Sequence, residues 1–300
     1  MRNLLISRNK VSIISALAAV ALTAVMLLGL PRLQQLRANS ALASANAHIA
    51  RADSLMSGID VPATAAASFS SLDGINQARG ALADADASLG KAAIEVNQSR
   101  EEAAAACGLS LLPGWYRDYL GKKRDAAGLR LQQIHMLRQA ADKLGRLYAA
   151  GPVIFQAQQD IDRLTGQLET AVGQIQATPA QAQSALRQIA QSLRGVQKQL
   201  DDQQAKATFD LLAQMSQQVG NEAGAAEAAA QFASAVAAGD QGRAGSAART
   251  LEQELLAIGA GADALSRWQS RNIDPLLNQA GDLQAQEEKL DREAAGLYRP

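Results

Sequence analysis

The amino-acid sequence predicts an all-α protein. Alanine and leucine supply most of the apolar residues, whereas Phe, Trp and Tyr together make up only 3% of the 300 residues. Alanine and leucine favour the helix, because alanine loses no side-chain entropy there and leucine loses little. Valine, isoleucine and the aromatic residues nowhere alternate with polar residues as a half-buried strand requires. The predicted architecture is an N-terminal transmembrane helix followed by elongated antiparallel helical bundles, or coiled-coil-like hairpins.

The N-terminal sequence is typical of a membrane anchor. Residues 1–10 form a short basic tail, and residues 11–30 contain no charged residue. A helix of this length spans about 30 Å, which matches the hydrocarbon core of a bilayer. The alternative is a cleaved signal peptide, whose apolar core is shorter and is followed closely by a small-residue cleavage site. The nearest such site, at residues 43–47, lies far beyond the apolar stretch. We therefore expect an uncleaved single-pass anchor.

The charges that flank this segment favour a cytoplasmic N-terminus by a small margin. Three basic residues and the amino terminus precede the segment, and Arg32, Arg37 and Arg51 follow it. By the positive-inside rule, residues 31–300 are expected outside the cytoplasm. The near balance keeps the opposite orientation open.

Two long helices are expected directly after the anchor. Apolar and small residues recur at steps of three and four over residues 32–57, and Gly58 and Pro62 end this first helix. The second helix, residues 70–107, repeats a large and then a small residue every seven positions, with Gly108 as its left-handed cap. The residues at the first position are Ile75, Leu82, Leu89, Val96 and Ala103. The small residues, three positions later in each repeat, are Ala78, Ala85, Ala92, Ser99 and Ala106. Such a stripe lets neighbouring helices approach closely, so we expect it to be buried.

The third and fourth helices are expected to meet at Gly151 and Pro152, because these residues disfavour helix continuation. Ser110 and Pro113 are start signals for the third helix, which is predicted to run to about Ala150. The fourth has the most regular apolar spacing of the chain, over Ile154, Ala157, Ile161, Leu164, Leu168, Ala171 and Ile175.

The remaining helices are separated by short breaks near residues 177, 220, 239 and 274. Thr178, Pro179 and Gln181 are the cap, first helical and capping-box residues expected for the fifth helix. Its apolar spacing drifts after Gln203, and the sequence VGNEAG is expected to end it. A sixth, alanine-rich helix is expected between the breaks near residues 220 and 239. The seventh helix, after residue 240, carries an apolar stripe over Leu251, Leu255, Ile258, Ala262 and Leu265. Short connections indicate antiparallel neighbours, which we group into a membrane-proximal region, 31–151, and a distal bundle, 152–300.

The alanine-rich stretch of residues 222–248 is a candidate surface for a partner helix. Its small side chains permit close packing, and closure of its own bundle is the alternative use.

The sequence contains no motif that indicates an enzyme. His48 and His135 are the only histidines, and neither has Cys, Asp or Glu at a metal-ligand spacing. The acidic pairs are adjacent in sequence, so their side chains point in different directions and are interpreted as solvated faces. These pairs are Asp84 with Asp86, Glu101 with Glu102, Asp201 with Asp202, and Glu287 with Glu288. We expect no catalytic residue, no cofactor and no metal, and the formal net charge of zero gives no reason to expect nucleic acid.

One segment combines aromatic and basic residues, which membrane interfaces attract. The candidate membrane-interface residues are Trp115, Tyr116, Arg117, Tyr119, Lys122, Lys123 and Arg124. Alternatively, the rings cap the end of a bundle core and the lysines lie in solvent. Cys107, the only cysteine, excludes an intrachain disulfide and is interpreted as a small apolar residue near a helix end.

These features favour a non-catalytic helical scaffold or interaction protein of a bacterial-type cell envelope. It is expected to contact the lipid bilayer through residues 11–30 and to bind protein partners or itself. Two alternatives stay open: an extracytoplasmic sensory or ligand-binding module, with polar residues converging near Gln203, and a membrane-organising scaffold that faces the cytoplasm. The layout is similar to that of bacterial single-pass proteins that display helical bundles, and to spectrin-like anchored scaffolds. This likeness of plan assigns no functional residue.

Overall fold

A computed structural model describes residues 30–65, 71–207, 210–261 and 264–298. All regular secondary structure in these ranges is helical, which confirms the predicted all-α class and the helical bundles. No helix in the described part of the chain combines the length and hydropathy of a bilayer span. The predicted anchor, residues 11–30, lies outside the described residues except for Leu30.

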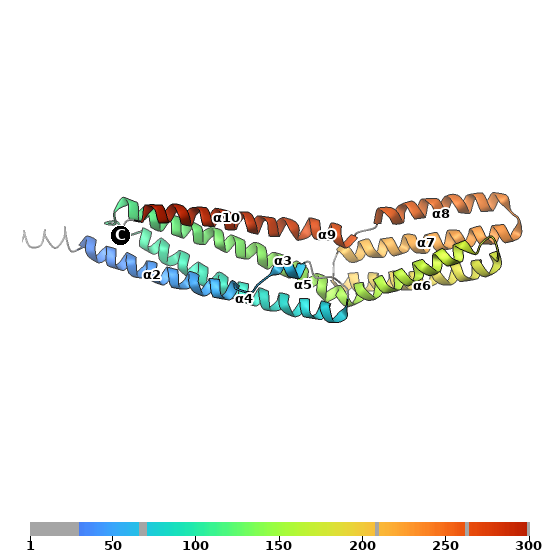
Figure 1. Cartoon of the computed structure of the whole chain (residues 1–300), viewed down its shortest axis with the longest axis horizontal. Helices are drawn as coiled ribbons and strands as arrows, with labels where there is room; N and C mark the ends of the chain where they lie inside the picture. The colour runs from blue at the N-terminus through green and yellow to red at the C-terminus, as the bar shows by residue number, and fades with distance from the viewer. Residues whose placement is uncertain (1–29, 66–70, 208–209, 262–263, 299–300) are drawn as a thin grey trace, which may run out of the picture. The chain divides into compact units, whose positions relative to one another are not determined.

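The helices follow one another with short connections (Figure 1). They are α2 (Leu30–Met56), α3 (Val61–Ala65), α4 (Leu72–Cys107), α5 (Gly114–Gly173), α6 (Pro179–Ala207), α7 (Asp210–Ala238), α8 (Gln241–Gly261), α9 (Ala264–Asn272) and α10 (Asp274–Leu297).

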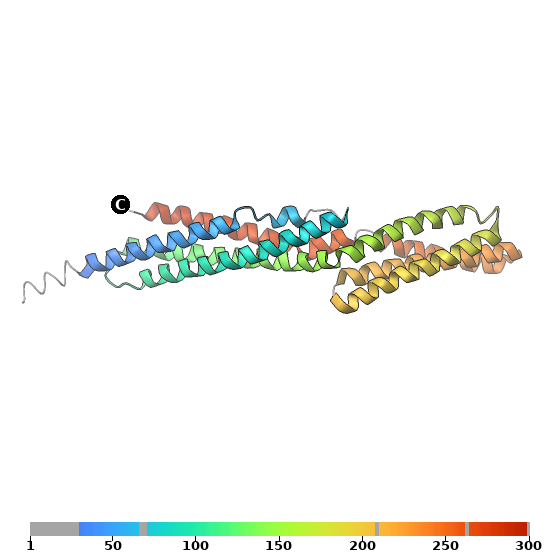
Figure 2. The same ribbon diagram turned by 90° about the horizontal axis from the view of Figure 1, so that it is seen from below.

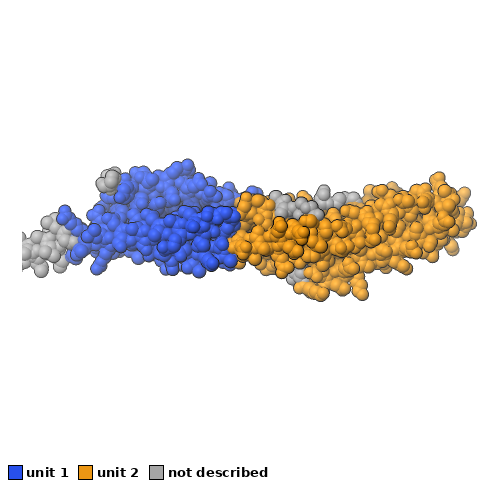
Figure 3. Space-filling view, turned by 60° about the horizontal axis from the view of Figure 1, so that its bottom comes forward, with its two compact units in different colours: residues 1–59, 87–138, 278–300 blue, residues 60–86, 139–277 orange. Residues whose placement is uncertain are grey.

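The chain divides into two compact units, each assembled from separate segments (Figure 3). Unit 1 combines residues 1–59, 87–138 and 278–300, and unit 2 combines residues 60–86 and 139–277. The predicted division after residue 151 groups the chain differently. Helices α4, α5 and α10 each give one part to unit 1 and the other part to unit 2.

In unit 1, α2 and the first part of α5 run in the same direction in constant register. Three hydrogen bonds each join residues 77 positions apart: Leu111 with Gln34, Tyr116 with Asn39, and Arg130 with Asp53. A constant difference between partners is the signature of parallel neighbours. The register places the connection between α4 and α5 beside the first turns of α2.

The other two helix segments of unit 1 run antiparallel to these neighbours. Along α5 and α10 the partner number falls as the residue number rises: Lys122 pairs with Glu293, Lys123 with Asp291, Arg130 with Glu287, and Gln133 with Gln284. The buried core draws on all four segments, because Ala38, Ala106, Leu120 and Ala294 belong to one apolar cluster. Unit 1 is therefore a four-helix bundle of α2, α4, α5 and α10.

The predicted apolar stripes of α4 and α6 are buried. All ten residues of the heptad stripe in α4 have relative exposures of 8% or less. In α6 the predicted stripe, Leu186, Ile189, Leu193, Val196 and Leu200, is buried throughout. The interpretation of these two patterns as buried packing faces is thus confirmed.

In unit 2, α6, α7 and α8 reverse direction at each connection and lie side by side (Figures 1 and 2). Helix α7 packs against both neighbours, so most of its alanines are buried, including Ala223, Ala226, Ala230 and Ala233. The first part of the alanine-rich stretch thus closes its own bundle, the alternative that the sequence offered.

The expected break at Gly151 and Pro152 is wrong, because α5 continues through Pro152 to Gly173. Proline costs about 3 kcal/mol in a helix interior, since it lacks the N–H donor and its ring crowds the preceding turn. Pro152 itself is exposed, while Tyr148 and Ile154 on either side are buried. Burial of such flanking residues offsets the cost.

The expected break at residues 219–224 is also wrong. Helix α6 ends at Ala207 and α7 runs from Asp210 through this stretch. Leu211, Met215 and Val219 are buried and continue in step with Ala223 and Ala226, so packing against α6 and α8 favours an unbroken helix. The drift in apolar spacing after Gln203 lies just before the end of α6 at Ala207.

Three smaller expectations also differ from the structure. Gly108 follows α4, but the positive φ angles of the described chain are at Gly58 (89°) and Gly239 (70°). Helix α6 does begin at Pro179, but the Thr178 hydroxyl donates to Gln174 O at 3.5 Å and so faces back toward the preceding turn. Leu255, expected in the stripe of the seventh helix, is 52% exposed on α8.

Candidate functional site

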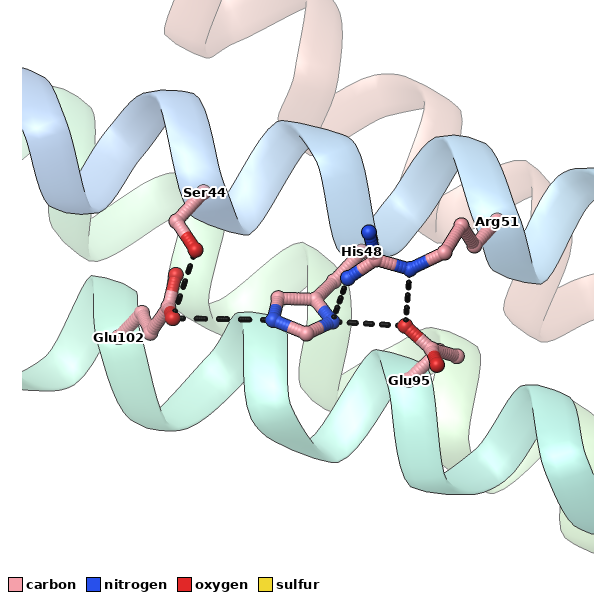
Figure 4. A network of polar contacts seen from close by, with 5 residues as sticks. All are labelled: Ser44, His48, Arg51, Glu95 and Glu102. Carbon is pink, nitrogen blue, oxygen red and sulfur yellow. Dashed lines mark hydrogen bonds and ion pairs between the residues drawn. The ribbon is translucent and has the colours of Figure 1, made fainter.

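A polar network joins α2 to α4 in unit 1 (Figure 4). His48 lies between two carboxylates: its Nδ1 is 2.7 Å from Glu95 Oε2 and its Nε2 is 3.7 Å from Glu102 Oε1. Arg51 Nε donates to the same Glu95 oxygen at 2.7 Å, and Ser44 Oγ donates to Glu102 Oε1 at 2.8 Å. The histidine side chain is only 14% exposed. The network is therefore a partly buried set of polar and charged side chains in which acidic residues of α4 face Ser44, His48 and Arg51 of α2.

Local helix geometry explains why these side chains meet. Ser44, His48 and Arg51 are spaced by four and three residues, so they share one face of α2. Glu95 and Glu102 are spaced by seven and share one face of α4, which runs antiparallel to α2. Electrostatic and hydrogen-bond contributions from Arg51 and His48 lower the pKa of Glu95 below its ordinary value.

The network does not have the geometry of a nucleophilic triad. In a triad the histidine accepts the proton of the serine and is oriented by the acid. Here Ser44 donates to the carboxylate of Glu102, so no imidazole nitrogen is placed to receive its proton. Across the described residues no group of three or more His, Cys, Asp and Glu side chains is arranged to hold a metal ion. The arrangement supports helix pairing.

His48 Nδ1 faces two groups that make opposite demands on it. Glu95 requires a proton on Nδ1, whereas Arg51 Nη2, 2.6 Å away, is itself a donor and requires a lone pair there. Both contacts cannot be satisfied at once. The favoured arrangement is the one in which Nδ1–H donates to Glu95, because that bond is assisted by charge.

The acidic pairs divide between core and solvent. Glu101 and Glu288 are exposed, whereas Glu102 contacts Ser44 and His48 and Glu287 is 8% exposed against Arg130, with a 3.3 Å ion pair. The solvated interpretation is therefore wrong for Glu287, whereas Glu102, whose side chain is 33% exposed, is partly solvated and also contacts α2. Their partners come from other helices, so no spacing within one helix identifies them.

The segment with the predicted membrane-interface residues lies at the start of α5. Tyr116 and Tyr119 are 2% and 8% exposed, and they stack with ring centroids 6.0 Å apart. Trp115 is partly buried against the same apolar cluster, and Arg117 is exposed. Burial raises the pKa of both tyrosines. The rings pack as the core-capping alternative expects, and their contact with a membrane stays a prediction.

Three of the four basic residues of this segment have acidic partners within unit 1. Lys122 pairs with Glu293, Lys123 Nζ lies 3.0 Å from Asp291 Oδ1, and Arg124 Nη2 lies 2.8 Å from Asp125 Oδ1. These contacts offset the charge of Lys122, Lys123 and Arg124, which was expected to attract lipid headgroups, and leave that of the exposed Arg117. Cys107 is partly buried nearby, and burial raises the pKa of its thiol.

A groove of about 690 Å³ opens in unit 2 between α5, α7 and the first turns of α9. Its walls combine apolar side chains, such as Ile154, Ile161 and Met215, with three carboxylates: Asp162, Glu169 and Glu222. No Lys, Arg or His lies among the described residues that line it. Gln203, where polar residues were expected to converge, is not part of the groove.

Glu222 is the buried carboxylate of this groove. It is 6% exposed, and Thr165 Oγ1 donates to its Oε2 at 3.5 Å. Burial raises its pKa, and the nearby charge of Asp162 raises it further, against the lowering effect of hydrogen bonds from Gln218 and Thr165. A carboxylate in such surroundings is stabilised by an approaching cation.

Comparisons of the chain with known protein families, with curated proteins and with solved structures give no match.

Proposed function

We propose that the protein is a single-pass, membrane-anchored helical scaffold that holds or spaces other macromolecules at a bacterial-type cell envelope. The observation that carries the proposal is the charge-free stretch of residues 11–30, directly followed by α2 and a bundle whose apolar stripes are satisfied internally. A bundle of packed helices that follows an anchor presents its polar surface to partners near the bilayer. The proposal assigns a binding role and no reaction.

The proposed orientation places the N-terminus in the cytoplasm and residues 31–300 outside it. Protease accessibility in spheroplasts tests this: external protease should degrade the helical units and leave a short membrane-bound fragment. Protection of residues 31–300 until the membrane is permeabilised would instead support the cytoplasm-facing scaffold. Recovery of the chain in the soluble fraction without its first forty residues would overturn the anchor.

The scaffold role itself is tested by crosslinking in intact cells. A scaffold should give discrete crosslinked species, either with other proteins or with a second copy, from a photoreactive residue on an exposed helix face. Leu256, which is 71% exposed on α8, is a suitable position, and Leu251 on the same helix, which is partly buried, is the control. A chain that yields no crosslinked species from any exposed position would contradict the proposal.

The groove of unit 2 supports a second candidate function, the binding of a small ligand. Three carboxylates without a basic residue in the lining favour a cation, and the apolar wall favours an alkyl chain on it. An aliphatic polyamine such as spermidine has both properties. Calorimetric titration should show binding to the parent chain and weaker binding to Glu222→Gln, with Glu227→Gln, whose side chain lies outside the groove, as the control. Absence of binding to the parent chain would remove this candidate.

A further inference from the structure

The start of α2 and the connection between α4 and α5 form one end of unit 1, which we call the base. The base consists of residues 30–37 and 108–114 (Figures 1 and 2). Its two parts are joined directly, because Leu111 N–H donates to Gln34 Oε1 at 2.9 Å. The register of 77 between α2 and α5 then fixes the height of every α5 residue relative to Leu30, where the charge-free stretch ends.

The base exposes large apolar side chains. Leu33 and Leu36 on α2 are 57% and 64% exposed, and Leu111 in the connection is 44% exposed. Leu30 adds a further 39% exposed leucine at the point where the chain leaves the described residues. The charged residues of the base are Arg32 and Arg37, both exposed, and residues 30–37 and 108–114 contain no acid. Exposed leucines beside basic residues match the surface layer of a bilayer with anionic headgroups.

The heights decide which residues reach that layer. At 1.5 Å per residue, Gln34 and Leu111 lie about 6 Å beyond Leu30, whereas Lys122–Arg124, level with residues 45–47, lie about 23 Å beyond it. The headgroup layer on one side of a bilayer is about 5–7 Å thick. Leu111 therefore falls within the layer when Leu30 is at its inner edge, and the lysines fall well outside.

We infer that the base rests on the bilayer surface, with Leu33 and Leu111 between the lipid headgroups and Arg32 beside anionic lipid. Leu36 and Arg37, about 9–11 Å beyond Leu30, lie just outside the headgroup layer. This inference rests on the proposed anchor, residues 11–30, and replaces the lysine-rich part of the predicted interface by the connection between α4 and α5. The chain thus touches the membrane at two places far apart in sequence, which fixes how the bundle leaves the bilayer.

Depth-dependent fluorescence quenching in lipid nanodiscs tests the inference. The full chain, with Cys107→Ser to remove the native thiol, receives a single cysteine for an environment-sensitive dye at Leu111, at Leu33 or, as control, at the exposed Asp125. The discs contain phosphatidylcholine with or without phosphatidylglycerol and a lipid spin-labelled near its headgroup. Circular dichroism checks that each variant keeps its helix content.

We expect quenching of at least twofold at Leu111→Cys and Leu33→Cys, larger with phosphatidylglycerol, and less than 1.2-fold at Asp125→Cys. Folded variants that enter the discs without quenching at positions 33 and 111 would overturn the inference and leave the anchor standing. Equal quenching at all three positions would also overturn it. A chain that fails to enter the discs would overturn the proposed anchor and this inference together.

Discussion

Glu95 is the residue on which the polar contacts between α2 and α4 converge. Arg51 Nε and His48 Nδ1 both lie 2.7 Å from the same carboxylate oxygen, and these contacts lower the pKa of Glu95. The folded protein therefore binds the proton of Glu95 less tightly than the unfolded chain does. The resulting stabilisation is present above the unfolded pKa and is lost as the pH falls through the lowered native value.

Glu95→Gln should accordingly reduce the pH dependence of stability. Between about pH 7 and about pH 3 the free energy of unfolding of the parent protein should fall more than that of the variant, since the glutamine cannot lose an ionised contact on acidification. Urea unfolding at both pH values measures the difference. Glu101→Gln is the matched control, because Glu101 is exposed and contacts only Asn97 on its own helix. Parallel pH profiles for the parent and Glu95→Gln would contradict the argument.

For single residues, the sequence predicts which side chains are buried better than it predicts which polar side chains contact one another across helices. The α4 stripe is visible in the sequence because its seven-residue period belongs to one helix. The partners of His48 and Arg130 come from α4, α2 and α10, and only the register between helices brings them together. Glu95 and Glu102, seven residues apart, were the one available signal of a polar face on α4.

Some helix ends are determined by the residues of the turn alone, through a glycine with a positive φ angle or a capping side chain. Gly58 and Gly239 have positive φ angles of 89° and 70°, and Asp240 Oδ1 accepts the Arg243 N–H at 3.0 Å at the start of α8. These ends lie at residues that the sequence marks as breaks. At Pro152 and Gly220, by contrast, the packing of buried neighbouring residues keeps the helix continuous. The local sequence predicts helix breaks there that do not occur.

Pro152→Ala should stabilise the protein, because Pro152 occupies an exposed position inside a continuous helix. Alanine restores the missing backbone donor, and the gain in the free energy of unfolding should reach about 1–3 kcal/mol. Pro179→Ala is the control: Pro179 is the first residue of α6, where proline is favoured, so no gain is expected. Urea unfolding compares the two variants. Equal effects would indicate that α5 is interrupted at residue 151.

Gly58→Ala should destabilise unit 1 by about 1 kcal/mol, because alanine disfavours a φ angle of 89°. No atom lies within 4 Å of the position of the added methyl group, so any loss reports on the backbone alone. Gly145→Ala, inside α5 and also without a near neighbour, should instead stabilise by about 0.5–1 kcal/mol. Thermal unfolding followed by circular dichroism gives both signs, and a stabilising Gly58→Ala would show that α2 ends differently.

On the scale of the whole molecule, each unit is built from segments that are distant in sequence. Unit 1 takes its fourth helix from residues 278–300, after the chain has completed unit 2. Connection lengths and apolar periods carry information only on helices that are consecutive in the chain. The sequence therefore predicted helical hairpins and gave no indication that α10 packs against α5. The same packing makes the ion pairs of Lys122, Lys123 and Arg130 with α10 possible.

This assembly predicts that a destabilising substitution in α10 also destabilises α2. Ala294 on α10 is fully buried in the cluster that contains Ala38 and Leu120, whereas its neighbour Ala295 is exposed. Ala294→Asp places an unpaired charge in that core and should cost about 3 kcal/mol or more. Hydrogen exchange should then accelerate in α2 and the first half of α5, while α6 and α7, which pack in unit 2, keep the rates of the parent protein. Ala295→Asp should leave every segment unchanged. Faster exchange in α6 and α7 to the same degree as in α2 would contradict the division into two cores, since it would make α10 a support of the entire chain.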